Sequence, residues 1–410
     1  MKTIEAIVIG GGQAGLAMSY CLNQKGIEHV ILEQAPQAGH AWRDMRWDSF
    51  YLLTPNWSLL LPGFEYNGPE PDRFISRAEI IAMLEQYASR YSMPVQYDTR
   101  VGAVIPLEDG GYHVLTDQGD WRAQDVIVAP GFFQRPKRSP VQGLLSPHIL
   151  QLHCSTDRNP EQLPQGGVLV VGSGQSGCQI AEELLESGRE VWLSVGSTGR
   201  VPRQYRGRDI MVWLNMSGFF DRTPEMLASP KLRFASNPHL SGTHGGHSLN
   251  LHLFARSGMH LIGHVLAGEG DRLQLADDLE NSLHVSDAVE TQVVQAIDAF
   301  ITAQHISAPE ENLPQYRDGF QQAGLTEMDL DAQGIRTIIW ANGFDFDYSM
   351  VRLPVTDSYG FPITRDGITD FPGLYFIGMP FVSKMKSGLF LGVGEDAHRI
   401  SSHIAGRHAP

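Results

Sequence analysis

The sequence predicts an α/β protein with two parallel sheets, because the pattern of strand, glycine-rich turn and helix occurs in it twice. The first copy places residues 10–15 between the apolar run 4–9 and a stretch rich in alanine and leucine. The second places residues 172–177 after the apolar run 168–171, again before residues with helical spacing. One such turn arises in many proteins for packing reasons, whereas two in the same context indicate two units of the same kind.

The glycines of both turns have the spacing of dinucleotide-binding loops, in which each glycine has a physical task. One permits the tight turn, one lets the backbone approach a pyrophosphate, and one allows the helix to pack closely on the strand. The amino end of that helix then receives the charge of the phosphates. We therefore expect two Rossmann-like domains that bind two dinucleotides, the first through Gly10, Gly12, Gln13, Ala14 and Gly15, and the second through Gly172, Ser173, Gly174, Gln175, Ser176 and Gly177.

The residues that follow each loop distinguish the two nucleotides. Glu33 stands 18 residues after Gly15, where an acid that binds an adenosine ribose is expected, and this favours FAD in the first domain. In the second domain, Ser194 and the residues after it offer no carboxylate, whereas Arg200 and Arg203 follow closely. Guanidinium groups beside a strand end suit a ribose 2′-phosphate, so we expect NADPH there, with a solvated basic loop as the alternative.

The order of the remaining elements predicts that the NADPH-binding domain is inserted into the FAD-binding domain. We assign residues 1–150 and 331–410 to the FAD-binding domain, and residues 151–330 to the NADPH-binding domain, with a variable insertion at about 205–260. A helix is expected at 77–91, a pair of antiparallel strands at 101–105 and 112–116, and a terminal helix at 392–404. The β-rich run 335–340 is interpreted as the return to the first domain.

Composition limits the classes of partner. The formal charge of -15 disfavours nucleic acid, which requires a basic face. No apolar run approaches the length of a membrane span, and no charged leader precedes the first strand, so a cytoplasmic protein without a membrane partner is expected. The three cysteines are scattered, which indicates neither a disulfide framework nor a dithiol centre. The expected partners are a small-molecule substrate and a second copy of the chain in a possible homodimer.

A group of histidines raises the question of a metal site. Their spacing matches no known helical ligand motif, and the sequence contains no His-Glu-x-x-His, so no metal is predicted. Three glycines in the same stretch would allow a mobile lid over a substrate or over NADPH, with a solvated connection as the alternative. The histidines are His239, His244, His247, His252 and His260, and the glycines are Gly242, Gly245 and Gly246.

Several segments together resemble the class B flavin-dependent monooxygenases, which include the flavin-containing N- and S-oxygenases, the Baeyer-Villiger enzymes and the auxin-forming oxygenases of plants. The resemblance covers nearly the whole chain. It rests on both glycine loops, Glu33, and the segments 39–43, 129–131, 340–344 and 372–378. It implies that the FAD site also contains Gln34, Ala41, Trp42, Thr54, Val101, Ala129, Gly131, Gly378 and Gly392.

Three residues are weak candidates for a catalytic role, which the sequence otherwise leaves unknown. Trp47 lies in the segment that covers the flavin in this family, with an ordinary buried tryptophan as the alternative. His153 fits the histidine of the family's linker motif, whose other marked positions differ here, and would orient NADPH or the linker. Asn56 is a candidate by position alone, because the family's Thr-Asn-x-Pro segment is replaced by Thr54-Pro55-Asn56.

The resemblance also implies an activity. NADPH would reduce FAD, the reduced flavin would capture O2 as a C4a-(hydro)peroxide, and one oxygen atom would be inserted into a small organic substrate. The substrate class remains open among N-, S- and carbonyl oxygenation. A second hypothesis is that FAD and NADPH bind without oxygenation, the protein acting as an NADPH oxidase or as a redox-responsive regulatory protein.

Overall fold

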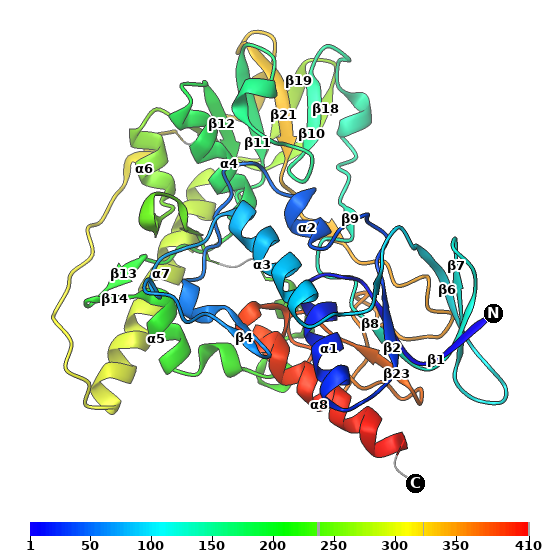
Figure 1. Cartoon of the computed structure of the whole chain (residues 1–410). Coiled ribbons are helices and arrows are strands. Elements are labelled where there is room, and N and C mark those ends of the chain that lie inside the picture. The colour runs from blue at the N-terminus through cyan, green and yellow to red at the C-terminus, as the bar shows by residue number, and fades with distance from the viewer. Residues whose placement is uncertain (236–237, 323, 409–410) are drawn as a thin grey trace.

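In a computed structural model, which describes residues 1–235, 238–322 and 324–408, the chain builds two large and separate β-sheets (Figure 1). The chain forms most of the first sheet, leaves it after β8 to build the second, and returns with β23 near the carboxyl terminus. The α/β class is confirmed. Both sheets are built on the same plan, with helices on one face and antiparallel strands against the other.

The first sheet has seven strands in the order β5-β2-β1-β8-β7-β6, and β23 pairs beside β8. The strands β5, β2, β1, β8 and β23 are parallel, whereas β6 and β7 are antiparallel, as expected from the sequence. The first half of β8 pairs with β7 and its second half with β23. The strands are β1 (Lys2–Ile9), β2 (His29–Leu32), β5 (Val95–Gln96), β6 (Val101–Pro106), β7 (Tyr112–Thr116), β8 (Trp121–Val128) and β23 (Leu374–Phe376).

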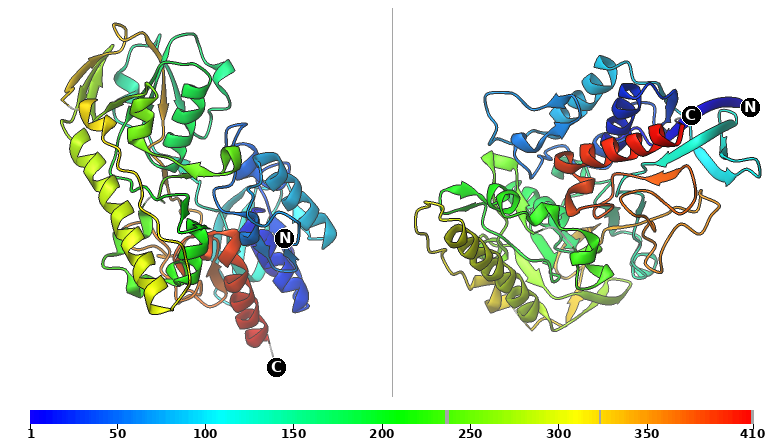
Figure 2. Two further views of the ribbon diagram at one scale, coloured as in Figure 1. Left: turned by 90° about the vertical axis from the view of Figure 1, so that its left-hand side faces the viewer. Right: turned by 90° about the horizontal axis from the view of Figure 1, so that it is seen from below.

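Alternate side chains of the first sheet enter two different cores, because successive residues of a strand point to opposite faces. Val8 and Ile127 pack against the helical layer, and Ile7 and Val126 pack on the opposite face with residues of β6 and β7. The helical layer consists of α1 (Gln13–Gln24), α3 (Arg77–Arg90) and α8 (Phe390–His408). Helices α1 and α8 lie side by side, although they come from opposite ends of the chain (Figure 2).

The second sheet has five parallel strands in the order β10-β21-β11-β12-β17. One face packs on α4 and α7, and the other on a small antiparallel sheet, β18-β19-β20. The large-sheet strands are β10 (Leu150–His153), β11 (Gly167–Val171), β12 (Val191–Ser194), β17 (His260–Ile262) and β21 (Ile335–Trp340). The others are α4 (Gln175–Glu186), α6 (Leu251–Arg256), α7 (Leu279–Ala303), β18 (Val265–Glu269), β19 (Arg272–Leu275) and β20 (Glu327–Asp329).

The expected boundary at residue 331 was wrong. The run 335–340 forms β21, which lies between β10 and β11 in the second sheet and does not join the first. The chain returns to the first unit only after Gly343, where β22 (Phe344–Asp345) pairs with β9 (Arg135–Pro136). The run is correctly identified as a buried strand, but an apolar β-branched segment suits any parallel sheet and does not specify which neighbours it pairs with.

The segment expected as a variable insertion, about 205–260, contains short elements, and two of its residues lie outside the described part of the chain. Its helix α5 (Ile210–Met216) is capped by Asp209, whose side chain accepts a hydrogen bond from the amide of Met211. Its strand pairs are β13 (Gln204–Tyr205) with β14 (Arg208–Asp209), and β15 (Leu240–Ser241) with β16 (His247–Ser248).

The remaining short elements lie in the connections of both units. They are α2 (His40–Arg43), β3 (Leu60–Leu61), β4 (Phe64–Glu65), and the 3-10 helices η1 (Asn56–Ser58), η2 (Gln142–Leu144), η3 (Pro160–Gln162), η4 (Phe219–Asp221), η5 (Pro224–Met226), η6 (Pro230–Phe234), η7 (Thr243–Gly245), η8 (Asp318–Gln322) and η9 (Met385–Gly388). Within the described ranges, no helix is both long and apolar enough to cross a membrane.

The two units meet through their helical layers. One continuous apolar core includes Val8 of the first sheet and Val170 of the second. At the edge of this contact, Glu183 on α4 shares a hydrogen bond with Ser49 of the first unit and lies near other carboxylates. Burial is the largest effect that raises the pKa of Glu183, from 4.5 to about 7, and Asp157, Glu161 and Asp48 add to it.

This carboxyl group should make stability depend on pH. Between the unfolded pKa of 4.5 and the folded pKa of about 7, the folded chain holds a proton that the unfolded chain has lost. Stability therefore falls as pH rises through that window. We expect Glu183→Gln to raise the free energy of unfolding at about pH 8 by roughly 1 kcal/mol, after allowance for partial exposure, and to change it little at about pH 4.

Urea unfolding at both pH values measures this effect. Glu186→Gln is the matched control, because Glu186 lies on the same helix and pairs with His244 at the exposed surface. Equal behaviour of Glu183→Gln and wild type at high pH would contradict the assignment.

Candidate functional site

The first glycine loop is fixed by close backbone approaches. Gly10 has φ 110°, and a Cβ there would collide with the carbonyl oxygen of Ala129 at the end of β8. A Cβ on Gly15 would collide with the carbonyl of Gly10, so the first turn of α1 packs directly on the loop. Gly12 differs from both. Its φ of -80° suits any residue, and no described atom lies within 4 Å of the place where its Cβ would be.

Glu33 lies against this loop, as its spacing predicts. Its Oε2 accepts the amide of Gly11 at 2.5 Å, and its Oε1 accepts the amide of Ala35 at 2.9 Å. The residue is buried. The loop therefore holds the carboxylate beside the amino end of α1.

The second glycine loop repeats this geometry. Gly172 has φ 107°, and a Cβ there would lie 2.7 Å from the carbonyl oxygen of Ala341, at the end of β21. A Cβ on Gly177 would collide with the carbonyl of Gly172. Gly174, the counterpart of Gly12, has φ -70°. Ala129 and Ala341 thus have equivalent positions beside the two loops, and Gly131 and Gly343 follow with φ 76° and 86°.

Arg200 and Arg203 do not have the environment expected of ligands for a 2′-phosphate. The side chain of Arg200 is 3% exposed and binds Asp287 and Glu290 on α7. Arg203, equally buried, binds Asp209 at 2.7 Å and donates to the carbonyl of Leu53 at 2.8 Å. Both guanidinium groups are neutralised by carboxylates. Arg200 pairs within the second unit and Arg203 also contacts the first, so both are structural in this conformation.

Many residues expected around FAD gather near the first loop. A Cβ on Gly378 would lie 2.5 Å from the Cβ of Ala14. Gln13 donates to the carbonyl of Gly388 at 2.8 Å, and its Oε1 is buried without a partner among the described residues. Trp42, which follows Ala41 in α2, stacks on Phe390 at the amino end of α8, with ring centroids 5.9 Å apart. These contacts bring α1, α2 and α8 together.

Other expected FAD residues are placed less directly. Gln34 is exposed and Thr54 is buried. Val101 begins β6, close to Thr99, whose amide donates to the carbonyl of Glu33. Gly392 is required by the fold itself, because a Cβ there would lie 2.5 Å from the carbonyl oxygen of Lys386.

The three catalytic candidates have different surroundings. Trp47 is 2% exposed and packs edge-on against Phe50, as a core tryptophan does. Asn56 is buried in η1 and donates to the carbonyl of Glu70 at 3.0 Å, while its Oδ1 has no partner in the described chain.

His153 ends β10 and contacts the carbonyl of Gly343 at 3.2 Å. Burial lowers the pKa of His153, which favours the neutral imidazole.

Arg46 is a buried cation that the sequence did not single out. Its guanidinium lies 3.8 Å from the ring centroid of Phe133 and 5.5 Å from that of Trp42. It donates to the carbonyl of Met45 at 2.7 Å and pairs with no carboxylate in the part of the chain that is described. Burial lowers the pKa of Arg46 to about 10, so it stays charged at neutral pH. A buried charge without a carboxylate partner is costly, so Arg46 is a candidate for contact with an anionic ligand.

The histidines of the middle segment serve as structural contacts. His247 binds Glu182 at 2.7 Å and His244 binds Glu186 at 3.3 Å, so both attach the segment to α4. His239 is fully buried against the carbonyl of Ser173, and burial lowers its pKa to about 4. No group of three potential metal ligands occurs among the residues that the structure describes.

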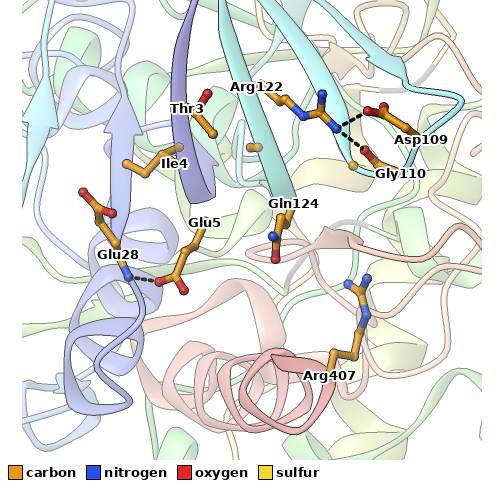
Figure 3. Close-up of a pocket in the computed structure, with 11 residues that line it drawn as sticks. Thr3, Ile4, Glu5, Glu28, Asp109, Gly110, Arg122, Gln124 and Arg407 are labelled. Atoms are coloured by element: carbon orange, nitrogen blue, oxygen red, sulfur yellow. Dashed lines mark hydrogen bonds and ion pairs between the residues drawn. The ribbon is translucent and has the colours of Figure 1, made fainter. Parts of the chain in front are cut away.

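Two surface pockets lie on the first unit. One of about 420 Å³ lies at the amino end of β1, between Glu5, Arg122 and Arg407 (Figure 3). This is the opposite end of the strand from the glycine loop, so it lies outside the candidate site. A second pocket, of about 300 Å³, is lined by residues 36–38 and Tyr97, shortly after Glu33.

Comparison with known proteins identifies the family. The family model described as pyridine nucleotide-disulphide oxidoreductase matches residues 7–215, just over half of the chain. An uncharacterized CzcO-like oxidoreductase of Geobacillus kaustophilus is 32% identical over 98% of both chains. The probable indole-3-pyruvate monooxygenase YUCCA1 of Arabidopsis thaliana is 30% identical over 49% of both.

A solved structure shows the same fold. The flavin-containing monooxygenase from Stenotrophomonas maltophilia superposes with a TM-score of 0.66 at 20% identity, covering 100% of both chains. The three cysteines, Cys21, Cys154 and Cys178, are free and buried in different places. The family model and the full-length relative show that the chain belongs to the pyridine nucleotide-disulphide oxidoreductase family and is a relative of the CzcO-like oxidoreductases.

Proposed function

We propose that this protein is an FAD- and NADPH-dependent monooxygenase that inserts one atom of O2 into a small organic substrate. In this proposal the first sheet carries FAD, and the second, from β10 to β21, carries NADPH. The two glycine loops, the family and the relatives named as monooxygenases support it. The candidate substrate groups are nitrogen, sulfur and carbonyl.

The observation that carries the proposal is the free space at Gly12. Gly10 and Gly15 are glycines because the fold has no room for a side chain there. Gly12 has neither constraint, since its φ is ordinary and its Cβ would meet no described atom. A glycine that the fold does not need, at the amino end of a helix, leaves room for a bound phosphate group.

Residues of the first unit would hold the rest of FAD. In this proposal Glu33 binds the ribose hydroxyls, and the unpartnered Oε1 of Gln13 accepts a hydrogen bond from the cofactor. Trp42 and Phe390 provide aromatic surface at the amino end of α8. The helix dipole at that end favours negative charge nearby.

Arg46 would supply the positive charge of the site. It lies within the same aromatic group as Trp42 and lacks an anionic partner among the described residues. A buried guanidinium stabilises negative charge strongly because water does not screen it. When bound, FAD reduced by NADPH supplies the electrons that activate O2. The role of the chain is to orient the two nucleotides, exclude water and stabilise the charge of reduced flavin.

The fate of oxygen tests the proposed activity. FAD-loaded protein is reduced with NADPH and then given isotopically labelled O2 with amines, sulfides or ketones. We expect at least one compound to take up the label while hydrogen peroxide release falls below NADPH consumption. Peroxide that equals NADPH consumption with every compound would support the oxidase hypothesis instead.

Replacing Arg46 tests its electrostatic role. Arg46→Met keeps much of the apolar stem but removes the charge, so the reduced, negatively charged flavin loses stabilisation. We expect the flavin reduction potential to fall by tens of millivolts, where roughly 30 mV corresponds to about 1.4 kcal/mol. Spectroelectrochemical titration of FAD-loaded protein measures the shift.

Arg90→Met is the matched control. Arg90 also lies over an aromatic ring, that of Phe64, but it is exposed at the end of α3. Its removal should leave the potential unchanged. A potential that is the same in Arg46→Met and in wild type would show that the guanidinium does not act on the flavin.

A further inference from the structure

His264 lies beside the second glycine loop, at the carboxyl ends of β12 and β17. These strands are parallel, with Ser194 opposite Ile262, so the residues that follow them leave the sheet at the same edge. The amide of Gly196 donates to Oγ of Ser173 at 2.8 Å, which connects this edge to the loop. A Cβ on Gly196 would lie 3.5 Å from Nε2 of His264.

Asp278 holds the ring of His264 in this position. Its Oδ2 lies 2.6 Å from Nδ1 of His264, and its Oδ1 accepts the backbone amide of the same residue at 3.1 Å. Asp278 stands at the amino end of α7 but makes no capping bond there with its side chain. Its carboxylate is therefore committed to His264, and Nε2 is the ring nitrogen that points toward Gly196 and the loop.

The two arginines near this edge have other partners. Arg200 is bound by Asp287 and Glu290, and Arg203 by Asp209, so the charge of each guanidinium is already matched by a carboxylate. The segment from Ser194 to Thr198 contains no carboxylate that would bind two free ribose hydroxyls. A half-exposed imidazole and the hydroxyls of Ser197 and Thr198 remain at this edge.

We propose that His264, positioned by Asp278, binds the 2′-phosphate of NADPH and so determines which nicotinamide nucleotide the protein uses. This inference rests on the proposed function, because it assumes that the second loop binds the adenosine end of the nucleotide. Nδ1 must donate its proton to Asp278, so Nε2 donates to a phosphate oxygen only as part of the imidazolium. His264 then acts as a charged donor held in one orientation.

Binding of small nucleotides to FAD-loaded protein tests the inference without requiring turnover. The probes are 2′,5′-ADP and ADP, which differ only in the 2′-phosphate, and calorimetry measures both affinities. We expect wild type to bind 2′,5′-ADP about tenfold more tightly than ADP, and His264→Gln to abolish this preference while keeping its affinity for ADP. His264→Arg should keep or increase the preference.

His260→Gln is the control on the same strand. His260 stacks on Trp192 at the other end of β17, with ring centroids 4.2 Å apart, and should leave the preference unchanged. Equal preference in His264→Gln and wild type, or no preference in wild type, would overturn the role of His264 and leave the proposed function standing. Failure of wild type to bind either probe would overturn the proposed function and the inference together.

Discussion

The structure depends on one steric constraint that occurs twice. At each glycine loop, the carbonyl of an alanine at the end of the adjacent strand approaches so closely that only glycine fits, at Gly10 and at Gly172. The last glycine of each loop lets the following helix pack on the same turn. These contacts fix the amino ends of α1 and α4 at the carboxyl edges of their sheets. The first-turn backbone amides of both helices therefore face that edge, where an anionic group such as a phosphate can bind.

The parts of the account that follow from local rules could be predicted from the sequence. The glycine spacing predicted both loops, and the distance from Gly15 to Glu33 placed the carboxylate where the structure has it. Pairing between distant segments could not be predicted in this way. The run that forms β21 was identified as a strand, but its neighbours β10 and β11 depend on long-range packing.

Charges were predicted least well, because a sequence shows a charge without its partners. The sequence predicted that Arg200 and Arg203 bind a phosphate. In the structure, Arg200 pairs with two carboxylates on α7 and Arg203 pairs with Asp209. Arg46 is the opposite case, an arginine without any distinguishing spacing that folding buries among aromatic rings with no carboxylate beside it in the described chain. Burial and pairing decide which cations are structural and which can act on a ligand.

The central claim is that each loop binds one nucleotide, and matched variants of the two loops test it most directly. Gly12→Val and Gly174→Val add a side chain at ordinary φ values, -80° and -70°, and at Gly12 the side chain enters space that no described atom occupies, while far-UV circular dichroism checks the folding of both variants. We predict that Gly12→Val purifies without FAD, and that Gly174→Val keeps FAD but is no longer bleached by NADPH in the absence of oxygen. Normal FAD content in the first variant, or normal bleaching in the second, would contradict the account.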